Sequence, residues 1–393
     1  MDWRLQRIRE EILRLGGQGL DWLTFATGVT ELLRRVVPFD RSCWHTVDPG
    51  TILFTGSLNQ GVGCSGSWLA HHEYVIEDVN KWSFLARSGR RAGATSLATH
   101  GDLSRSARHR SHESLGIEDE LRASFVRTGT YWGAAGFLRD QGSLWFTEAE
   151  VHTVAGLSEA IAEGLRRAML SRYVTAQVTQ GVGPGVIVFD EDGHAESISP
   201  AAEHWVEQLL EEPPPVSPSE SNVVQVVAAR ARAANGTRDP LELTARCRAR
   251  TRSGSWVLLY GTRLSGGIEG KTAVIVQPAA FSEVVPLVAL AYGLSERECQ
   301  LAQLCIEGRS TKEMASALSV SPYTVQDHLK SIFNKTGARS RGELVGQVFL
   351  EHYVPRWEDA AGPEGWSAKD TVTVDLKSTV GVAGRGRERA EPV

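Results

Sequence analysis

The clearest hydrophobic pattern lies near the C-terminal end of the chain, where apolar residues recur at helical spacing in four short stretches. Each stretch follows its own helix-start signal. Three of these signals pair a serine with a glutamate three residues later, which is the spacing of a capping box, and the fourth is a serine followed by proline. The pattern predicts four short helices within residues 294–355. The signals are Ser295 with Glu298, Ser310 with Glu313, Ser321 with Pro322, and Ser340 with Glu343.

Residues 1–170 mix helical and strand patterns. Two helices are expected first, one ending at Gly16-Gly17 and one over residues 21–36. Thr147 and Glu150 form a further capping box, which opens a helix with an apolar face. Helices that flank a mixed sheet predict an α+β domain. The expected strands lie at residues 42–47, 52–55 and 131–138.

A polar stretch interrupts this region at residues 86–114. It is rich in Arg, Ser, Gly and His and has no apolar periodicity. Such a length without periodicity predicts a long loop that is functional or partly disordered. Arg105, Arg108 and Arg110 lie within it, and we expect them to be solvated, with a lid over a site as the alternative.

Residues 171–280 predict a second, smaller unit. A short apolar strand over 185–190 precedes a turn, and Ser199-Pro200 starts a helix that ends before three consecutive prolines. Two strands close the unit, at residues 256–264 and 272–276. A linker helix is expected over residues 281–293. The tail, residues 356–393, is rich in Gly, Pro and charge and is expected to be mobile.

Four arginines alternate with other residues late in this second unit, which places their guanidinium groups on one face of a strand. We expect a solvated face that protects a sheet edge. The alternatives are contacts with DNA phosphate, with an anionic ligand or with an acidic partner domain. The four residues are Arg246, Arg248, Arg250 and Arg252.

Composition excludes several classes of protein. The chain has 393 residues, of which 41% are hydrophobic and 23% charged, so wholesale disorder and collagen-like structure are excluded. Five scattered cysteines without a CxxC pair fit a reducing cytosol. The longest near-apolar run, residues 284–294, is too short to cross a membrane. We therefore expect a soluble cytoplasmic protein without a membrane partner.

The charge is unevenly distributed. The net charge of −5 argues against indiscriminate coating of nucleic acid, so any such site must be local. Residues 321–341 are the candidate for such a local site, because they carry four cations and one acid. In a helix-turn-helix, the third predicted helix would enter the major groove of DNA. The residues near its exposed start would then face base edges, namely Tyr323, Gln326, Asp327 and Lys330.

Three segments carry a family resemblance: residues 294–298, 308–315 and 321–330, continued by 332–337 and 339–341. Together they closely resemble the LuxR-type helix-turn-helix over about 60 residues. The resemblance implies that Thr324, Lys335 and Arg341 contact the DNA backbone. It places Gln326, Asp327 and Lys330 at base-reading positions and assigns the dimer contact to the fourth helix.

This sequence departs from the family at two of its positions. Thr336 stands where the family usually has Leu, which should loosen a packing contact. Gln326 stands where Lys is frequent, which removes a charge. Neither departure breaks the motif, but both leave the operator sequence open. A four-helix domain that binds protein is the alternative.

The upstream units resemble sensory domains. Residues 20–170 look like a GAF-type α/β/α domain, and residues 185–276 resemble a PAS-type domain. Both folds hold a pocket between sheet and helices. Trp44, Trp82 and Trp132 are the candidate lining of a ligand pocket, and core packing is the alternative for all three. The predicted fold class is thus multidomain α+β.

No catalytic or metal constellation emerges from the spacing. His71-His72-Glu73 lacks the ligand spacing of a zinc site, and residues 266–272 fit a hairpin turn better than a phosphate loop. No nucleophilic triad can be assembled, so we predict neither an enzyme nor a bound cofactor.

The resulting hypothesis is a bacterial transcription regulator. Its partners would be double-stranded DNA, a second copy of the chain in a homodimer and a small-molecule signal, with RNA polymerase as a further candidate. The alternative is a ligand-sensing or scaffold protein whose helical domain mediates protein–protein contacts.

Overall fold

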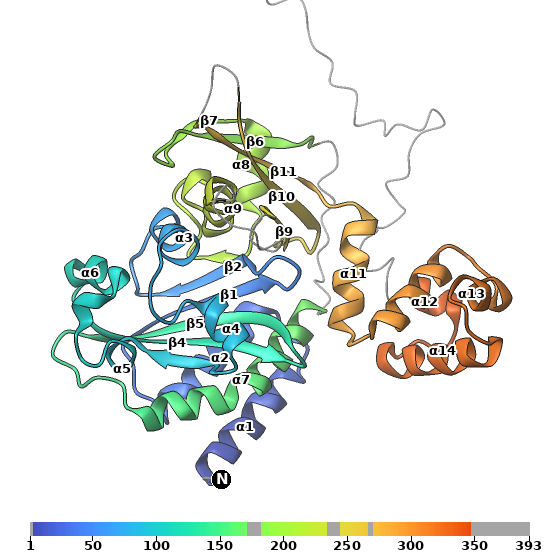
Figure 1. Ribbon diagram of the computed structural model, residues 1–393, viewed down its shortest axis with the longest axis horizontal. Helices are drawn as coiled ribbons and strands as arrows, with labels where there is room; N and C mark the ends of the chain where they lie inside the picture. Colours follow the sequence, from blue (N-terminus) through green and yellow to red (C-terminus); the bar gives the residue numbers. More distant parts are fainter. Residues whose placement is uncertain (1–2, 171–181, 234–243, 266–269, 347–393) are drawn as a thin grey trace, which may run out of the picture.

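The computed structural model describes residues 3–170, 182–233, 244–265 and 270–346 of the chain. These residues form a mixed α+β region with two sheets, followed by a helical region (Figure 1). The first sheet has the order β3-β4-β5-β1-β2-β8, in which β2 and β8 pair in parallel and all other neighbours are antiparallel. Its strands are β1 (Arg41–Asp48), β2 (Leu53–Gln60), β3 (Ala92–Ala94), β4 (Ile117–Arg127), β5 (Thr130–Asp140) and β8 (Glu211–Glu212).

Helices cover both faces of this sheet. α1 (Trp3–Gly16), α2 (Trp22–Arg34) and α7 (Glu148–Met169) pack on one face. α3 (Gly66–Tyr74) and α4 (Trp82–Ser88) lie over the other (Figure 1). The predicted capping box of α7 is confirmed, since Thr147 accepts from the Glu150 amide and Glu150 accepts from the Thr147 amide.

The prediction of a long loop over residues 86–114 was wrong. The segment contains β3 and four short helical elements, and Arg108 within it is fully buried. Its guanidinium pairs with Glu120 and Asp78. Ion pairs with residues distant in the sequence therefore hold this segment in place. Because polar residues make these contacts, the segment has no apolar periodicity from which its structure could be predicted. The elements are α5 (Thr95–Ala98), η1 (Leu103–Arg105), α6 (Ala107–His112) and η2 (Glu113–Leu115).

The second sheet has the order β7-β6-β11-β10-β9. Counted within each unit, both sheets share the strand order 2-1-5-4-3, with β8 as an addition to the first. The predicted strands at 185–190, 256–264 and 272–276 are confirmed, and Ser199 caps a helix that starts at Pro200. The elements are β6 (Gly185–Phe189), β7 (Ala195–Ile198), α8 (Pro200–Glu207), η3 (Pro218–Glu220), α9 (Asn222–Ala233), β9 (Arg246–Arg250), β10 (Trp256–Arg263) and β11 (Thr272–Pro278).

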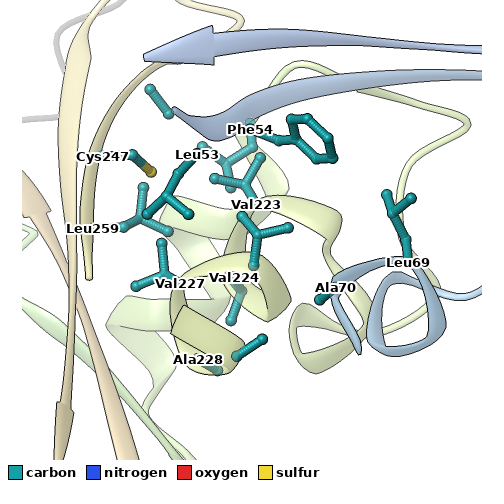
Figure 2. Packing of buried hydrophobic residues seen from close by; sticks show 14 of the residues in the cluster. Leu53, Phe54, Leu69, Ala70, Val223, Val224, Val227, Ala228, Cys247 and Leu259 are labelled. Carbon is teal, nitrogen blue, oxygen red and sulfur yellow. The ribbon is translucent and has the colours of Figure 1, made fainter. Parts of the chain in front are cut away.

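One helix joins the two units into a common core. α9 lies between the sheets and is apolar on most of its surface, so it has no amphipathic pattern. Figure 2 shows Val223, Val224 and Val227 of α9 among side chains from β2, α3, β9 and β10. The residues that surround them include Leu53, Phe54, Leu69, Ala70, Cys247 and Leu259.

The expectation of a solvated face for the four alternating arginines holds for Arg246, which is exposed, but was wrong for the other three. Arg248 reaches the first sheet, where its guanidinium binds the buried carboxylate of Asp48 at 2.6 and 2.8 Å. Arg250 donates to the carbonyl of Met169 at the end of α7, and Arg252 donates to that of Glu211. The alternative of contact with an acidic group on another domain fits Arg248, which binds Asp48 of the first unit, whereas Arg250 and Arg252 bind backbone oxygens.

A helix connects this body to the C-terminal region. α11 (Phe281–Ala291) packs on Trp256 and Leu258 of β10 and contributes to the same core as the helices that follow (Figure 1). Arg166 of α7 donates to the carbonyl of Ala291, and Arg248 donates to that of Glu283. A helix of the first unit and a strand of the second unit therefore both contact α11. The helices that follow are α12 (Glu296–Ile306), α13 (Thr311–Ala317), α14 (Pro322–Thr336) and α15 (Arg341–Glu343).

Residues after 346 lie outside the described part of the chain. Most of the predicted fourth helix and the tail at 356–393 fall there. No helix among the described residues is both long enough and apolar enough to span a bilayer.

Candidate nucleic-acid interface

Local capping fixes where the C-terminal helices begin. Both predicted boxes at Ser295 and Ser310 are present, with the serine accepting from the glutamate amide and the glutamate from the serine amide. Ser321 accepts from the amide of Thr324, and Pro322 occupies the first helical turn, where a missing N–H costs little. The helix starts read from the sequence are thereby confirmed for α12, α13 and α14.

A tight turn joins α13 to α14. Ser319 within it has a φ of 54°, a left-handed conformation that reverses the chain in few residues. Gly337 ends α14 in the same conformation, with a φ of 79°. The geometry is that of a helix-turn-helix, in which α14 is the second helix, called the recognition helix below.

The recognition helix has one buried and one exposed face. Val325, Leu329 and Ile332 are buried in the core that the helical region shares with α11. The opposite face carries Gln326, Asp327 and Lys330, all exposed, and Tyr323 has 74% of its surface accessible. The structure thus brings the three predicted base-reading residues together on one outward face.

The three predicted backbone-contacting residues have partners within the protein. The hydroxyl of Thr324 lies 2.9 Å from that of Ser321. The ammonium of Lys335 lies 2.7 Å from a carboxylate oxygen of Glu298, and Arg341 donates to the hydroxyl of Thr311 at 2.6 Å. These contacts hold the three side chains near the ends of α13 and α14.

Glu298 is the residue of this site that sequence reasoning missed. It is 3% exposed, and it accepts hydrogen bonds from Ser295, Ser331 and Lys335. Burial alone would raise the pKa of this carboxyl, but the hydrogen bonds from Lys335, Ser295 and Ser331 together lower it to about 2. The capping box was the available signal, but it did not reveal the contact with the recognition helix.

Thr336, which departs from the family pattern, has a satisfied hydroxyl. It donates to the carbonyl of Ile332 at 2.9 Å and accepts from the amide of Ala338 at 3.3 Å. A polar side chain is therefore tolerated at the end of the recognition helix, because the backbone supplies its partners.

Comparison with known proteins identifies this region. The profile of the family "Bacterial regulatory proteins, luxR family" matches residues 293–347. The spore germination protein GerE of Bacillus subtilis (strain 168) is 35% identical over 55 residues, which are 14% of this chain and 74% of GerE. The chain belongs to the LuxR family.

Two further similarities are more limited. A protein named as an HTH-type transcriptional regulator in the exeN 3' region of Aeromonas salmonicida is 38% identical over 61 residues, which are 16% of this chain. The match spans only 31% of that relative's length. The crystal structure of the phage VqmA–DPO complex is 18% identical, with a TM-score of 0.16, over 44% of this chain and 85% of that one.

Upstream of the LuxR-family region, the three candidate pocket tryptophans do not surround one cavity. Trp44 lies in the core between the first sheet and α2 and α7, where it stacks on Phe125 with ring centroids 5.2 Å apart. Trp82 lies on the opposite face of that sheet and donates to the carbonyl of Ala135. Trp132 lines a separate cavity of about 40 Å³. All three are at most 2% exposed, so they fill the interior of this protein.

A larger cavity lies elsewhere. It measures about 900 Å³, is open to solvent and lies between α5 and the start of α7. Trp145, Phe146 and His152 line it, and none of the three predicted tryptophans does. A cavity of about 20 Å³ borders Trp82 and His45 in the interior.

One group of the described residues has the composition of a cation site. The side chains of Asp190, Asp192 and His194 lie within 4.8 Å of one another in the turn after β6. Asp190 accepts from the amide of His194 at 2.8 Å, as in an ordinary turn. The group is largely exposed and carries no assignment.

Proposed function

We propose that this LuxR-family chain is a transcription regulator that binds double-stranded DNA through its recognition helix. The observation that carries the proposal is the outward face formed by Gln326, Asp327 and Lys330 on a helix whose opposite side is buried. An amide, a carboxylate and an ammonium group suit adenine, cytosine and guanine edges respectively. Thr324, Lys335 and Arg341 would contact the phosphate backbone beside them.

The two-sheet region is proposed to sense a signal. Both sheets have the strand order 2-1-5-4-3, and the first has helices on both faces, which supports the resemblance to GAF-type and PAS-type domains. A small molecule is the proposed signal. The open cavity of about 900 Å³ has room for one, and it is the better candidate because the three tryptophans are packed in the interior.

The proposed route from sensor to DNA runs through α11. Arg166 from the first unit and Arg248 from the second both donate to carbonyls of this helix. A change in the packing of either unit would therefore shift α11 and the DNA-binding helices attached to it. Two chains acting as a homodimer would then gain or lose the spacing between their recognition helices. Such a regulator would act in the cytoplasm, where it meets DNA and RNA polymerase.

A selection experiment tests the proposal. The purified full chain would be used to select duplexes from a random-sequence library, and the selected duplex would be measured by fluorescence anisotropy between about 50 and 200 mM salt. Lys330→Ala should weaken binding about tenfold or more and relax specificity at one position. Lys271→Ala is the control, because this lysine pairs with Glu196 in the second sheet.

The outcome decides between the two classes of function. Salt-sensitive, sequence-selective binding that Lys330→Ala weakens would support the regulator. A chain that enriches no duplex at any salt concentration would contradict it and leave a helical region that contacts proteins.

A further inference from the structure

A buried carboxylate connects the first helix of the LuxR-family region to the recognition helix. Glu298 lies in the first turn of α12, and its two oxygens face different partners. One oxygen accepts from the Ser295 amide at 2.6 Å and from the Lys335 ammonium at 2.7 Å. The other accepts from the Ser331 hydroxyl at 2.7 Å. Two of the three donors therefore belong to α14.

Capping alone does not require these contacts. Glu313 caps α13 in the same way, and its carboxylate accepts from the Ser310 amide at 2.7 Å. That side chain is 56% exposed, however, and it also forms an ion pair with Arg309 at 3.9 Å. The side chain of Glu298 is only 5% exposed, and it binds Ser331 and Lys335 of the recognition helix. The two glutamates share a local role but differ in what they hold.

Lys335 is placed where it can serve two partners. Its side chain remains 37% exposed while its ammonium binds Glu298. An ammonium group has three donors, so two N–H groups remain beyond the one on the carboxylate. A lysine held in one orientation loses less side-chain freedom when it meets a phosphate than a freely rotating one. The Glu298 carboxylate itself is buried in the protein.

We propose that Glu298 is a positioning residue for DNA binding, which fixes the recognition helix against α12 and holds Lys335 ready for a phosphate. This inference rests on the proposed DNA-binding function. The phosphate contact made by Lys335 would then depend on Glu298, which holds its ammonium group. Loss of either member should then have nearly the same effect on binding.

The test is a double-mutant cycle read out by salt dependence. Each phosphate contact contributes about 0.9 to the slope of log affinity against log salt concentration. Full-length wild type, Glu298→Gln, Lys335→Ala and the double variant would be titrated on one selected duplex of about 30 base pairs, a length that covers two half-sites about one turn apart. Glu298→Gln and Lys335→Ala should each lower affinity about tenfold and lower the slope by about 0.9. The double variant should be no worse than either single variant.

Glu313→Gln is the matched control, because it removes the same charge and the same kind of cap without touching α14. It should retain the wild-type slope. Glu298→Asp is a second variant that keeps the charge on a side chain one methylene shorter. It should lower the slope as well, since position rather than charge is at issue. Protein concentrations would be corrected for the active fraction, so that partial unfolding does not change the slope.

Three results would overturn the inference. These are a wild-type slope for Glu298→Gln, tighter binding by that variant, or full additivity with Lys335→Ala. Each requires that the wild type binds DNA, so each separates this inference from the function itself. A wild type that selects no duplex would overturn both.

Discussion

Buried polar side chains in this protein fall into two kinds, those with partners and those without. Glu298 and Asp48 each accept several hydrogen bonds, one of those to Glu298 and two of those to Asp48 coming from a cation. His45 on β1 is 2% exposed, and neither of its ring nitrogens has a hydrogen-bond partner among the described residues. Burial and then the charge of Arg122 lower its pKa to about 3, so it is neutral at physiological pH.

Replacing His45 with Phe should stabilise the protein. The ring already stacks on Phe54, with centroids 4.3 Å apart, and the adjoining cavity of about 20 Å³ gives room for the larger ring. Removing two unsatisfied nitrogens should raise the free energy of unfolding by about 1 kcal/mol in urea denaturation. His72→Phe is the control. It should destabilise, because His72 binds the Trp68 carbonyl and the Ser111 hydroxyl.

The same histidine predicts a pH dependence. Its pKa is lower in the folded chain than its usual 6.5, so the unfolded chain binds the extra proton first as pH falls. Stability should therefore decline from about pH 6.5 down to about pH 3, and the variant with Phe at this position should lack that part of the decline. Equal pH profiles for both proteins would contradict the buried, neutral state of His45.

At the scale of helices and strands, distant contacts decide whether a charged residue is buried, and the local sequence pattern does not. β9 looks like a solvated edge strand in sequence, but one of its arginines binds Asp48 of β1 and the backbone of α11. β4 carries Glu120 and Arg122 in the interior, where they pair with each other at 2.9 Å. Buried charges of this kind hide the strand pattern, since they break the alternation of apolar and polar residues.

Arg248→Ala should strongly destabilise the two-sheet region. It leaves Asp48, which is 1% exposed, without its cation, and breaking a buried pair in this way costs about 3–5 kcal/mol. Thermal and urea unfolding of the full chain would measure the loss. Arg246→Ala on the same strand is the control, because that residue is exposed and should change stability by less than about 0.5 kcal/mol. Equal effects of both variants would argue against the contact.

At the scale of the whole molecule, the net charge of −5 conceals a local positive face. Its four cations lie in the recognition helix or just after it, at Lys330, Lys335, Arg339 and Arg341. α11 joins this helical region to the two-sheet region (Figure 1). One such face is small, and a single LuxR-family helix-turn-helix would make few phosphate contacts. Binding by a homodimer, as proposed, would double them.

The dimer predicts a dependence on the spacing of half-sites in DNA. Two recognition helices related by a two-fold axis reach half-sites about 10 base pairs apart, on one face of the duplex. Inserting about 5 base pairs between the selected half-sites rotates one of them to the opposite face, and should weaken binding at least about tenfold. Anisotropy titrations on both duplexes would measure this. Equal affinity for both would show that the chain binds as independent monomers.

The sequence alone determined where the helices of the C-terminal region begin and where three strands of the second sheet lie, at 185–190, 256–264 and 272–276. Ser295, Ser310 and Ser321 start helices through hydrogen bonds that span three residues, so local spacing suffices to predict them. The same holds for the helix after Thr147 and for the outward placement of Gln326, Asp327 and Lys330. Family resemblance located the DNA-binding helices for the same reason, because its motif is a string of such local signals.

Only the tertiary structure decided that residues 86–114 form short ordered elements and that α9 is buried. The same is true of the ion pair between Arg248 and Asp48 and of the contact between Glu298 and Lys335. In each case the partner lies far along the chain, from 12 residues between Arg108 and Glu120 to 200 between Asp48 and Arg248. A charge or an apolar run has the same local pattern whether it meets water or a distant partner. Burial, which the fold alone determines, separates the two.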